Sequence, residues 1–431
     1  MINIDREGRV MEAPTKGIVS TLVKMDMGHH LAMLYTPITP TEVSSVGVIL
    51  MHCDQNYMCL DMGPALAERG YQVLGVDAWV GGEIDRKLEH LGKAVKFLKS
   101  RPGVEKIVLM GHSGGATLIS AYQAIAENGP EIFRGDNMVY KCTVRDKLTP
   151  ADGMMLIDAN YGNAIMSMVS MDPGVIEEGN GMKLDPKYDI FDPANGYDPQ
   201  GANYSPDFIR MYQKAQVERN NRLVAFAQER LEKILKGEGD YEEDEPLMIA
   251  AADQPKPNNR LLPEDLHLLA HTKGAYDLLH ADGTVTHEQI KCLRTAECDR
   301  CFSSTYGMGV NKNTVKGFLS SQVIKADPET FAITEDDVLG VDWDSSYASP
   351  IGNVKHIHAP SLFMGMTGGY EYMASELIWN NAPMEDKTIA FVRGATHMFF
   401  PNRDAEKVYG SFGDTEKVLY DYMADWMKKF A

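Results

Sequence analysis

The sequence is poor in cysteine, and this scarcity limits the kinds of protein that it can encode. Six cysteines occur in 431 residues, too few for the disulfide framework of a small secreted scaffold. The first nine residues are polar and lack the apolar segment of a secretory signal. We therefore expect reduced thiols and a cytoplasmic location.

Long apolar runs and an excess of positive charge are missing as well. No run approaches the roughly 18 apolar residues that a membrane-spanning helix needs. The chain has 42 basic and 61 acidic residues and a net charge of −19, which repels nucleic-acid phosphates and anionic lipid headgroups. We expect a small-molecule substrate and neither a nucleic-acid nor a membrane partner, while assembly into a homodimer stays open.

Motifs for nucleotide cofactors and metals are absent or incomplete. There is no GxGxxG after the first buried strand and no P-loop. Cys298 and Cys301 have the spacing of half a zinc site, but no second pair accompanies them. We expect no cofactor and no bound metal.

The most informative segment that is present runs from residue 106 to residue 122. An apolar, strand-type run leads into Gly111-His112-Ser113-Gly114-Gly115, and helix-forming residues follow. Glycines two before and two after a serine are needed on so sharp a strand-to-helix turn, because a Cβ there would collide with its neighbours. The pattern predicts a nucleophile elbow with the Ser113 hydroxyl exposed.

Strands and helices alternate on both sides of this elbow. Continuous apolar runs predict strands that are buried on both faces of a parallel sheet, and residues with helical spacing separate them. The predicted strands are 18–25 and 31–35 as a hairpin, then 46–51, 71–77, 106–110, 153–158, 360–366 and 388–393. The predicted helices include 60–69, 86–100, 374–379 and a final amphipathic helix from about 419 to 427.

Between residues 160 and 346 this rhythm stops. Ser205 as N-cap, Pro206 as the first helical residue and Gly237 as the stop predict one long helix. A capping box of Thr286 and Gln289 predicts a second one. We expect this insertion to form a mainly helical cap over the substrate pocket.

A histidine lies where a catalytic base is needed. A serine hydroxyl is a weak nucleophile until a histidine accepts its proton and an acid holds that histidine in the correct tautomer. His397 follows the last predicted strand and precedes the terminal helix. We therefore predict that His397 is the base.

With Ser113 in its elbow, His397 after the last strand and an insertion after strand six, the chain resembles the α/β-hydrolase fold superfamily. The resemblance covers residues 17–160 and 346–431. It implies an α/β fold with a mostly parallel central sheet and helices on both faces, a hydrolase core of residues 1–159 and 347–431, and a cap of residues 160–346.

The resemblance leaves the triad acid open among three carboxylates. In that family the acid usually follows the strand that here spans residues 361–366, and the usual aspartate is absent. Glu371 is the nearest carboxylate and is our first choice, with Glu376 as a second possibility. Asp158, at the end of the strand 153–158, is the third, because some members take their acid from that position.

The same resemblance suggests an oxyanion hole. One backbone amide would come from Gly114, after the nucleophile, and the other from Cys53 in the loop after strand 46–51. Members of the family usually have His-Gly where this chain has His52-Cys53, and the Tyr57 hydroxyl could assist. Cys53 is also a nucleophile candidate in principle, but no elbow surrounds it.

The leading functional hypothesis is a serine hydrolase that cleaves a carboxylic ester or lactone of a bulky apolar small molecule through an acyl-enzyme on Ser113. An acyltransferase or a carbon-carbon bond hydrolase could use the same triad. A ligand-binding protein without catalysis is the alternative from another class. Side chains expected along the pocket are Tyr161, Met166, Met168 and Met171.

Overall fold

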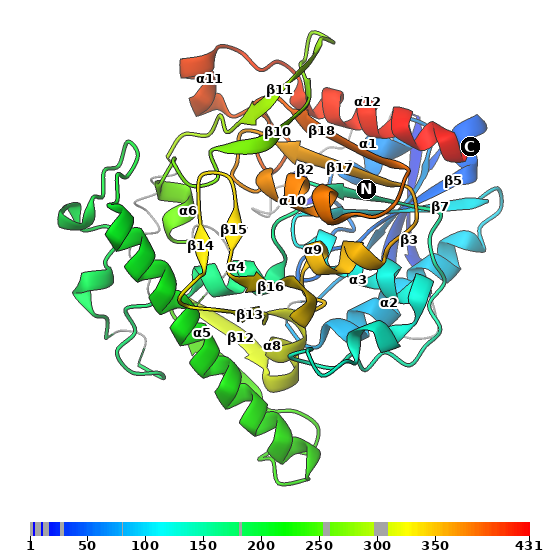
Figure 1. Cartoon of the computed structure of the whole chain (residues 1–431). Helices are drawn as coiled ribbons and strands as arrows, with labels where there is room; N and C mark the ends of the chain where they lie inside the picture. The colour runs from blue at the N-terminus through cyan, green and yellow to red at the C-terminus, as the bar shows by residue number, and fades with distance from the viewer. Residues whose placement is uncertain are drawn as a thin grey trace.

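The computed structural model describes residues 3–4, 10–11, 17–25, 30–79, 81–180, 183–252, 259–296 and 309–431. Its centre is one sheet of ten strands (Figure 1). In spatial order the strands are β11 (Val285–Lys291), β10 (His271–Leu279), β18 (Lys387–Val392), β17 (Ser361–Met366), β8 (Gly153–Ile157), β7 (Lys106–His112), β5 (Val46–Leu50), β6 (Gln72–Val76), β4 (Leu31–Pro37) and β3 (Ile18–Lys24).

The middle of this sheet is parallel and its two edges are antiparallel. All neighbours from β10 through β18, β17, β8, β7 and β5 to β6 pair in parallel, whereas β11 and the β4–β3 hairpin pair antiparallel. The hairpin is as predicted. Residues 26–29, which connect its two strands, lie outside the described residues. The α/β architecture with a mostly parallel sheet is therefore confirmed.

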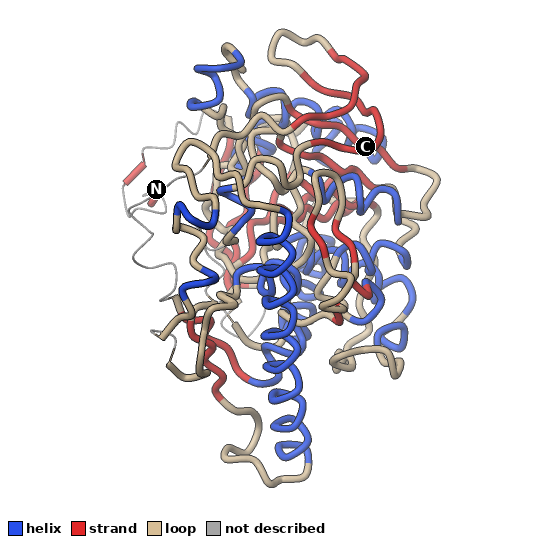
Figure 2. The backbone as a smooth tube through the Cα atoms, turned by 60° about the vertical axis from the view of Figure 1, so that its left-hand side comes forward, coloured by secondary structure: helices blue, strands red, loops and turns tan. Residues whose placement is uncertain are grey.

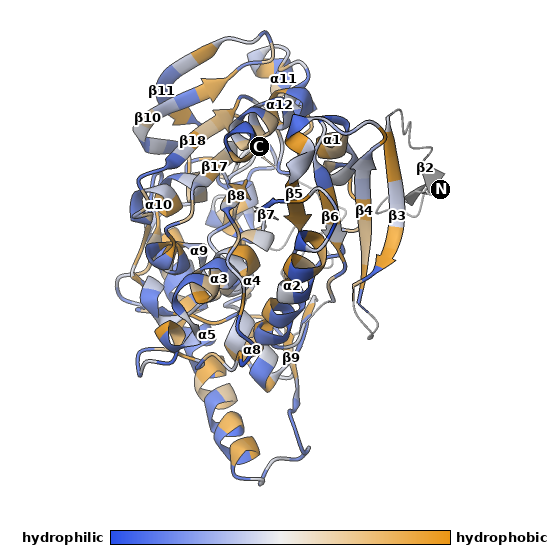
Figure 3. Cartoon of the chain, turned by 90° about the vertical axis from the view of Figure 1, so that its right-hand side faces the viewer, coloured by the Kyte–Doolittle hydropathy of each residue, from blue (hydrophilic) through white to orange (hydrophobic). Residues whose placement is uncertain are grey.

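Helices cover both faces of the sheet, as Figure 3 shows edge-on. Helices α1 (Met62–Glu68) and α12 (Thr415–Met427) pack on one face. Helices α2 (Ile84–Lys99), α3 (Gly115–Asn128) and α10 (Met373–Asn381) pack on the other. Successive residues of β5 alternate between the two cores, with Val48 and Leu50 in the first and Ile49 in the second, which explains its continuous apolar run.

The segment between β8 and β17 is not one helical cap, and our prediction for it needs correction. Strands β10 and β11 come from within residues 160–346, yet they extend the central sheet, with β10 parallel to β18. Thr286 and Gln289, which we expected to begin a helix, lie in β11. Val285–Lys291 pairs with β10 at the edge of the sheet and contributes only Ile290 to the core, so Thr286 and Gln289 do not begin a helix.

The rest of the segment between β8 and β17, which we call the excursion, packs on the face of the sheet that carries α2, α3 and α10. It contains the helices α4 (Asn163–Ser170), α5 (Pro206–Leu235), α6 (Leu261–Glu264) and α8 (Val315–Ser321) and the paired strands β9 (Pro246–Ala250) and β12 (Val310–Thr314). Two short strand pairs and a helix follow: β13 (Lys325–Ala326) with β16 (Val341–Asp342), β14 (Ala332–Ile333) with β15 (Val338–Leu339), and α9 (Pro350–Asn353).

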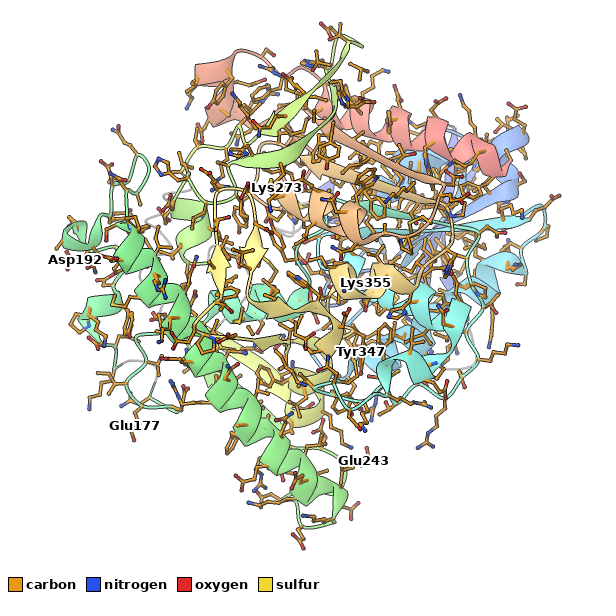
Figure 4. The ribbon with its side chains drawn as sticks, viewed as in Figure 1. Glu177, Asp192, Glu243, Lys273, Tyr347 and Lys355 are labelled. Carbon is orange, nitrogen blue, oxygen red and sulfur yellow. The ribbon has the colours of Figure 1, made fainter. Side chains whose placement is uncertain are left out.

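Helix α5 is the long helix that the sequence predicts. The Ser205 side chain accepts a hydrogen bond from the amide of Phe208 and caps the helix. The distal end of α5 extends away from the sheet (Figure 2). Figure 4 shows Glu177, Asp192 and Glu243 on the outer rim of the same excursion, so part of the chain's net negative charge lies there.

The chain returns to the sheet through a buried anchor. The Tyr347 hydroxyl, labelled in Figure 4, donates a hydrogen bond to Asp85 of α2 at 2.7 Å. Asp85 also accepts a hydrogen bond from the Thr143 amide at 2.7 Å.

Among the described residues, none of the helices is both long enough and apolar enough to span a bilayer.

Candidate active site

Ser113 lies on the turn between β7 and α3 in a left-handed backbone conformation, with φ at 56°. A Cβ on Gly111 would lie 2.8 Å from the backbone of Gly115 and Ala116, and one on Gly115 would lie 2.9 Å from the carbonyl oxygen of Met51. Both glycines are therefore required by close backbone approach. The predicted nucleophile elbow has the local geometry that its sequence indicates.

Asp158 occupies the corresponding position after the neighbouring strand β8, and it also has a positive φ, 43°. Its side chain is fully buried and accepts hydrogen bonds from the Met366 amide at 2.8 Å and from His397 Nδ1 at 2.6 Å. Strained residues of this kind persist where the surroundings fix them. The hydrogen bond to Asp158 fixes the orientation of the His397 ring.

Our first choice for the acid partner of His397 was Glu371, and the geometry corrects it. Asp158 is the carboxylate within hydrogen-bonding distance of Nδ1. Glu371, on the loop between β17 and α10, is buried nearby, and one ligand-type atom each of Asp158, Glu371 and His397 lie within 4.8 Å of one another. Asp158 is held in this position because its amide donates to the Met364 carbonyl oxygen and its carboxylate accepts from the Met366 amide, both in β17.

Glu376, the second possibility, has a structural position. It lies on α10, and its carboxylate accepts hydrogen bonds from the amides of Lys273 and Gly274 at 3.0 and 2.8 Å and from the Tyr276 hydroxyl at 2.9 Å. These three residues lie in β10. Glu376 therefore connects α10 to the added strand, and its hydrogen bonds go to β10.

The titration of Asp158 reflects two opposing influences. Burial raises the pKa of its carboxyl group, the hydrogen bond from His397 lowers it in part, and the charge of Glu371 raises it further. The net effect is a raised pKa of Asp158.

Asp158, Glu371 and His397 also form the single group of three among the described residues that could ligate a metal. However, His397 Nδ1 already hydrogen-bonds to Asp158.

A second histidine, His112, hydrogen-bonds to the backbone of His397. His112 Nε2 lies 2.8 Å from the backbone oxygen of His397, and its Nδ1 lies 2.6 Å from the Tyr57 hydroxyl. A carbonyl oxygen only accepts, so in a neutral His112 ring Nε2 carries the proton and Nδ1 accepts from Tyr57. The Tyr57 hydroxyl proton is thus committed to His112, which argues against the expected assistance to an oxyanion.

The predicted oxyanion loop follows β5 and is held by a buried cation. Lys87 of α2 is 1% exposed, and its ammonium group donates to the carbonyl oxygen of Cys53 and to Asp54 Oδ1, the latter at 2.9 Å. Asn163 Nδ2 donates to Asp54 Oδ2 at 2.9 Å. Burial alone would raise the pKa of Asp54, but Lys87 outweighs it and the pKa is lowered. The carboxylate therefore stays ionised.

Cys53 lies beside the nucleophile turn but is not among the residues that line the cavity described below. Its thiol is 3.1 Å from the Gly114 carbonyl oxygen. Burial, followed by the charge of Asp54, raises the pKa of this thiol. A protonated, buried thiol is a poor nucleophile, which argues further against nucleophilic attack by Cys53.

Ser113, Gly114 and His397 line one cavity of about 700 Å³. Of the four side chains expected along the pocket, Met166 lines it. Tyr161, Met168 and Met171 are instead buried in the core of that face. The cavity wall is also more polar than we expected, because six of its nineteen lining residues are asparagine or glutamine.

Several residues of the site were not singled out from the sequence. Lys87 carried a signal, since it lies at helical spacing among the apolar positions Ile84, Leu88 and Leu91, where a charge is unusual. Asn163, Asn311 and Gln322 carried none, because their positions depend on how the insertion folds. Cys298 and Cys301 lie outside the described residues.

Comparison with known proteins adds likenesses of fold only. No protein-family model matches the chain, and no curated protein matches it. Among solved structures, a siderophore hydrolase from Aspergillus fumigatus is 14% identical, with 97% of this chain and 99% of that one covered and a TM-score of 0.44. A proline iminopeptidase from Mycobacterium smegmatis is 12% identical, with 95% and 98% covered and a TM-score of 0.38.

A third likeness is to esterase B from Lactobacillus rhamnosis, at 14% identity and a TM-score of 0.30. It covers 36% of this chain and 52% of that one, so the match spans about half the length of that esterase. Identities and scores this low say nothing of substrate. The α/β architecture itself rests on the sheet order of this chain, in which Ser113, Asp158 and His397 follow β7, β8 and β18.

Proposed function

We propose that the protein is a serine hydrolase that cleaves a carboxylic ester or lactone through an acyl-enzyme on Ser113. The observation that carries the proposal is the 2.6 Å hydrogen bond from His397 Nδ1 to the buried Asp158, beside a serine held at positive φ on the same cavity. This bond fixes the tautomer in which Nε2 is the nitrogen that accepts a proton.

In the first half-reaction, Nε2 of His397 takes the Ser113 hydroxyl proton while Oγ bonds to the substrate carbonyl carbon. The resulting imidazolium is stabilised by the Asp158 carboxylate. The carbon-oxygen bond to the leaving group then breaks, and the leaving alkoxide takes the proton from His397. The product alcohol departs, or stays attached to the acyl group if the substrate is a lactone, and the acyl group remains on Ser113.

In the second half-reaction, His397 deprotonates a water molecule that adds to the acyl carbon. The bond to Ser113 Oγ breaks, Oγ recovers the proton, and the carboxylic acid leaves. We assign one oxyanion donor to the amide of Gly114, which lines the cavity, and the other to the backbone amide of Cys53, whose chain neighbours His52 and Asp54 line it; each is worth about 3 kcal/mol of the barrier in a dry site. The Lys87 contacts to Cys53 and Asp54 support this loop.

Hydrolysis of 4-nitrophenyl butyrate tests the proposal. We expect turnover by the wild-type protein and none above background with Ser113→Ala, whereas Ser100→Ala, a matched change at an exposed site, should turn over normally. A protein that binds ligands without catalysis would not hydrolyse the ester. Hydrolysis that survives in Ser113→Ala would show that another group is the nucleophile.

A further inference from the structure

Neutral amide side chains contribute six of the nineteen residues that line the catalytic cavity. The six are Gln55, Asn160, Asn163, Asn259, Asn311 and Gln322. Only Met166, Val310 and Met398 contribute aliphatic or thioether side chains. Pockets for apolar ligands are lined mostly by hydrophobic groups, with a few polar ones to orient the ligand. This cavity has the opposite balance of residue types.

Two of these amides form a pair that is contributed entirely by the insertion. Asn311 lies in β12, and Gln322 directly follows α8. The Asn311 amide nitrogen donates to Gln322 Oε1 at 2.7 Å. Both side chains are nearly buried, at 6% and 8% exposure. The bond orients the two groups relative to each other, and an oriented polar pair in a pocket wall is a means of selecting ligands.

Most of the hydrogen-bonding capacity of this pair remains open toward the cavity. A carboxamide has two N–H donors and a carbonyl oxygen acceptor. One bond between them leaves both N–H groups of Gln322 Nε2, the second N–H of Asn311 and the Asn311 oxygen. Within the described part of the chain no hydrogen bond uses these four groups. An apolar ligand that displaced the water of the cavity would leave them unsatisfied, which would weaken its binding.

Asn160 repeats the pattern on the side of the cavity where β8 ends. Its Oδ1 accepts from the Gly162 amide at 3.0 Å, which orients the side chain. Its amide nitrogen makes no hydrogen bond to the described residues and is not sealed from solvent. The wall therefore presents oriented, uncharged donors and acceptors from both the insertion and the sheet.

We propose that the substrate is a polar molecule whose acyl part carries neutral hydrogen-bonding groups, such as hydroxyls, and that Asn311 and Gln322 select it. This rests on the proposed hydrolase function and replaces the apolar substrate that the sequence suggested. A site built to hydrogen-bond a hydroxyl discriminates against the analogue that lacks it, since its own polar groups are then left unpaired.

Two 4-nitrophenyl esters with acyl chains of equal length test the proposal, the 6-hydroxyhexanoate and the heptanoate. The hydroxyl is too far from the carbonyl to alter its intrinsic reactivity. We expect kcat/KM to favour the hydroxylated ester about three- to tenfold, which corresponds to one additional hydrogen bond. A ratio of one or below would overturn the proposal.

Gln322→Met tests the assignment to the pair. It should lower kcat/KM for the 6-hydroxyhexanoate more than for the heptanoate and bring the ratio toward one, whereas the exposed Gln200→Met should leave the ratio as in the wild type. An unchanged ratio in Gln322→Met would contradict the assignment. Thermal melting of each variant separates loss of selection from loss of folding.

Binding by Ser113→Ala separates the two proposals. This variant should bind the 4-nitroanilide of 6-hydroxyhexanoic acid more tightly than that of heptanoic acid, whether or not the wild type hydrolyses esters. If selectivity is present without hydrolysis, the hydrolase proposal fails and the polar cavity stands. If hydrolysis is present without selectivity, the hydrolase proposal stands and the proposal of a polar substrate fails.

Discussion

Two parts of the candidate active site differ in origin. Ser113, Asp158 and His397 each follow a strand of the central sheet, β7, β8 and β18, whereas Asn311 and Gln322 come from the excursion between β8 and β17. Parallel strands bring their carboxyl ends to one edge of a sheet, where loops can share a site. In the proposed function, the sheet supplies the reacting groups and the excursion supplies recognition.

The largest effect on kcat should come from a residue that the central sheet contributes to the site. Asp158→Asn should reduce kcat on 4-nitrophenyl butyrate by about 10³- to 10⁴-fold, because an amide holds the wrong tautomer of His397 and does not stabilise the imidazolium. Steady-state kinetics measures the change. Glu371→Gln is the matched control and should cost less than about tenfold. If Glu371→Gln reduced kcat more than Asp158→Asn, Glu371 would be the acid.

The loop that carries Cys53 should depend on its buried cation. Lys87→Met leaves the Asp54 carboxylate without its partner and should lower the free energy of unfolding by about 3–5 kcal/mol. Urea denaturation followed by circular dichroism measures it. Lys417→Met removes an exposed ion pair with Asp421 and should change stability by less than about 1 kcal/mol. Equal losses in the two variants would contradict the role given to Lys87.

Glu376 should affect stability without affecting the chemistry. Glu376→Gln weakens three hydrogen bonds to β10 and should destabilise the protein by about 1–3 kcal/mol, measured by the same denaturation. The pH dependence of kcat/KM should stay as in the wild type. A shifted pH profile would instead place Glu376 in the site.

The smallest effect should be a shift of the acid limb of the pH–rate profile. Activity requires ionised Asp158 and neutral His397. Burial is the main cause of the raised pKa of Asp158, and the Glu371 charge adds to it. Glu371→Gln removes that charge, so the pKa falls and the acid limb of kcat/KM moves to lower pH. Movement to higher pH would contradict this assignment.

The same raised pKa has a consequence for folding. A carboxyl group whose pKa is higher in the folded than in the unfolded protein favours the folded state most at pH values below its unfolded pKa. This contribution is lost as the pH rises through the folded value. Asp158 therefore opposes folding at the pH at which it is active, and the hydrogen bond from His397 offsets part of that cost.

The sequence predicts the sheet well because its signals are local. Apolar runs such as Val46–Leu50 face two cores at once, and Ser113 requires glycines on both sides whatever the rest of the chain does. The order of strands along the chain also places His397 correctly after β18. For these elements local pattern and tertiary packing agree.

Elsewhere long-range packing decides, and the sequence is a weaker guide. Both Glu371 and Asp158 follow strands, and long-range hydrogen bonds to β17 hold Asp158 where it meets His397. Thr286 and Gln289 match a helix start, but pairing with β10 makes them a strand. The amide-rich wall depends on β12 and α8, which no local pattern assigns to the cavity.

Covalent labelling tests most directly whether Ser113 is activated by His397. After treatment with diisopropyl fluorophosphate, the intact mass of the wild-type protein should rise by one phosphoryl adduct, and peptide mapping should place it on Ser113. His397→Ala should not react at a comparable rate, whereas the exposed His287→Ala should. A wild-type protein that takes up no adduct, or takes it up elsewhere than on Ser113, would contradict the account.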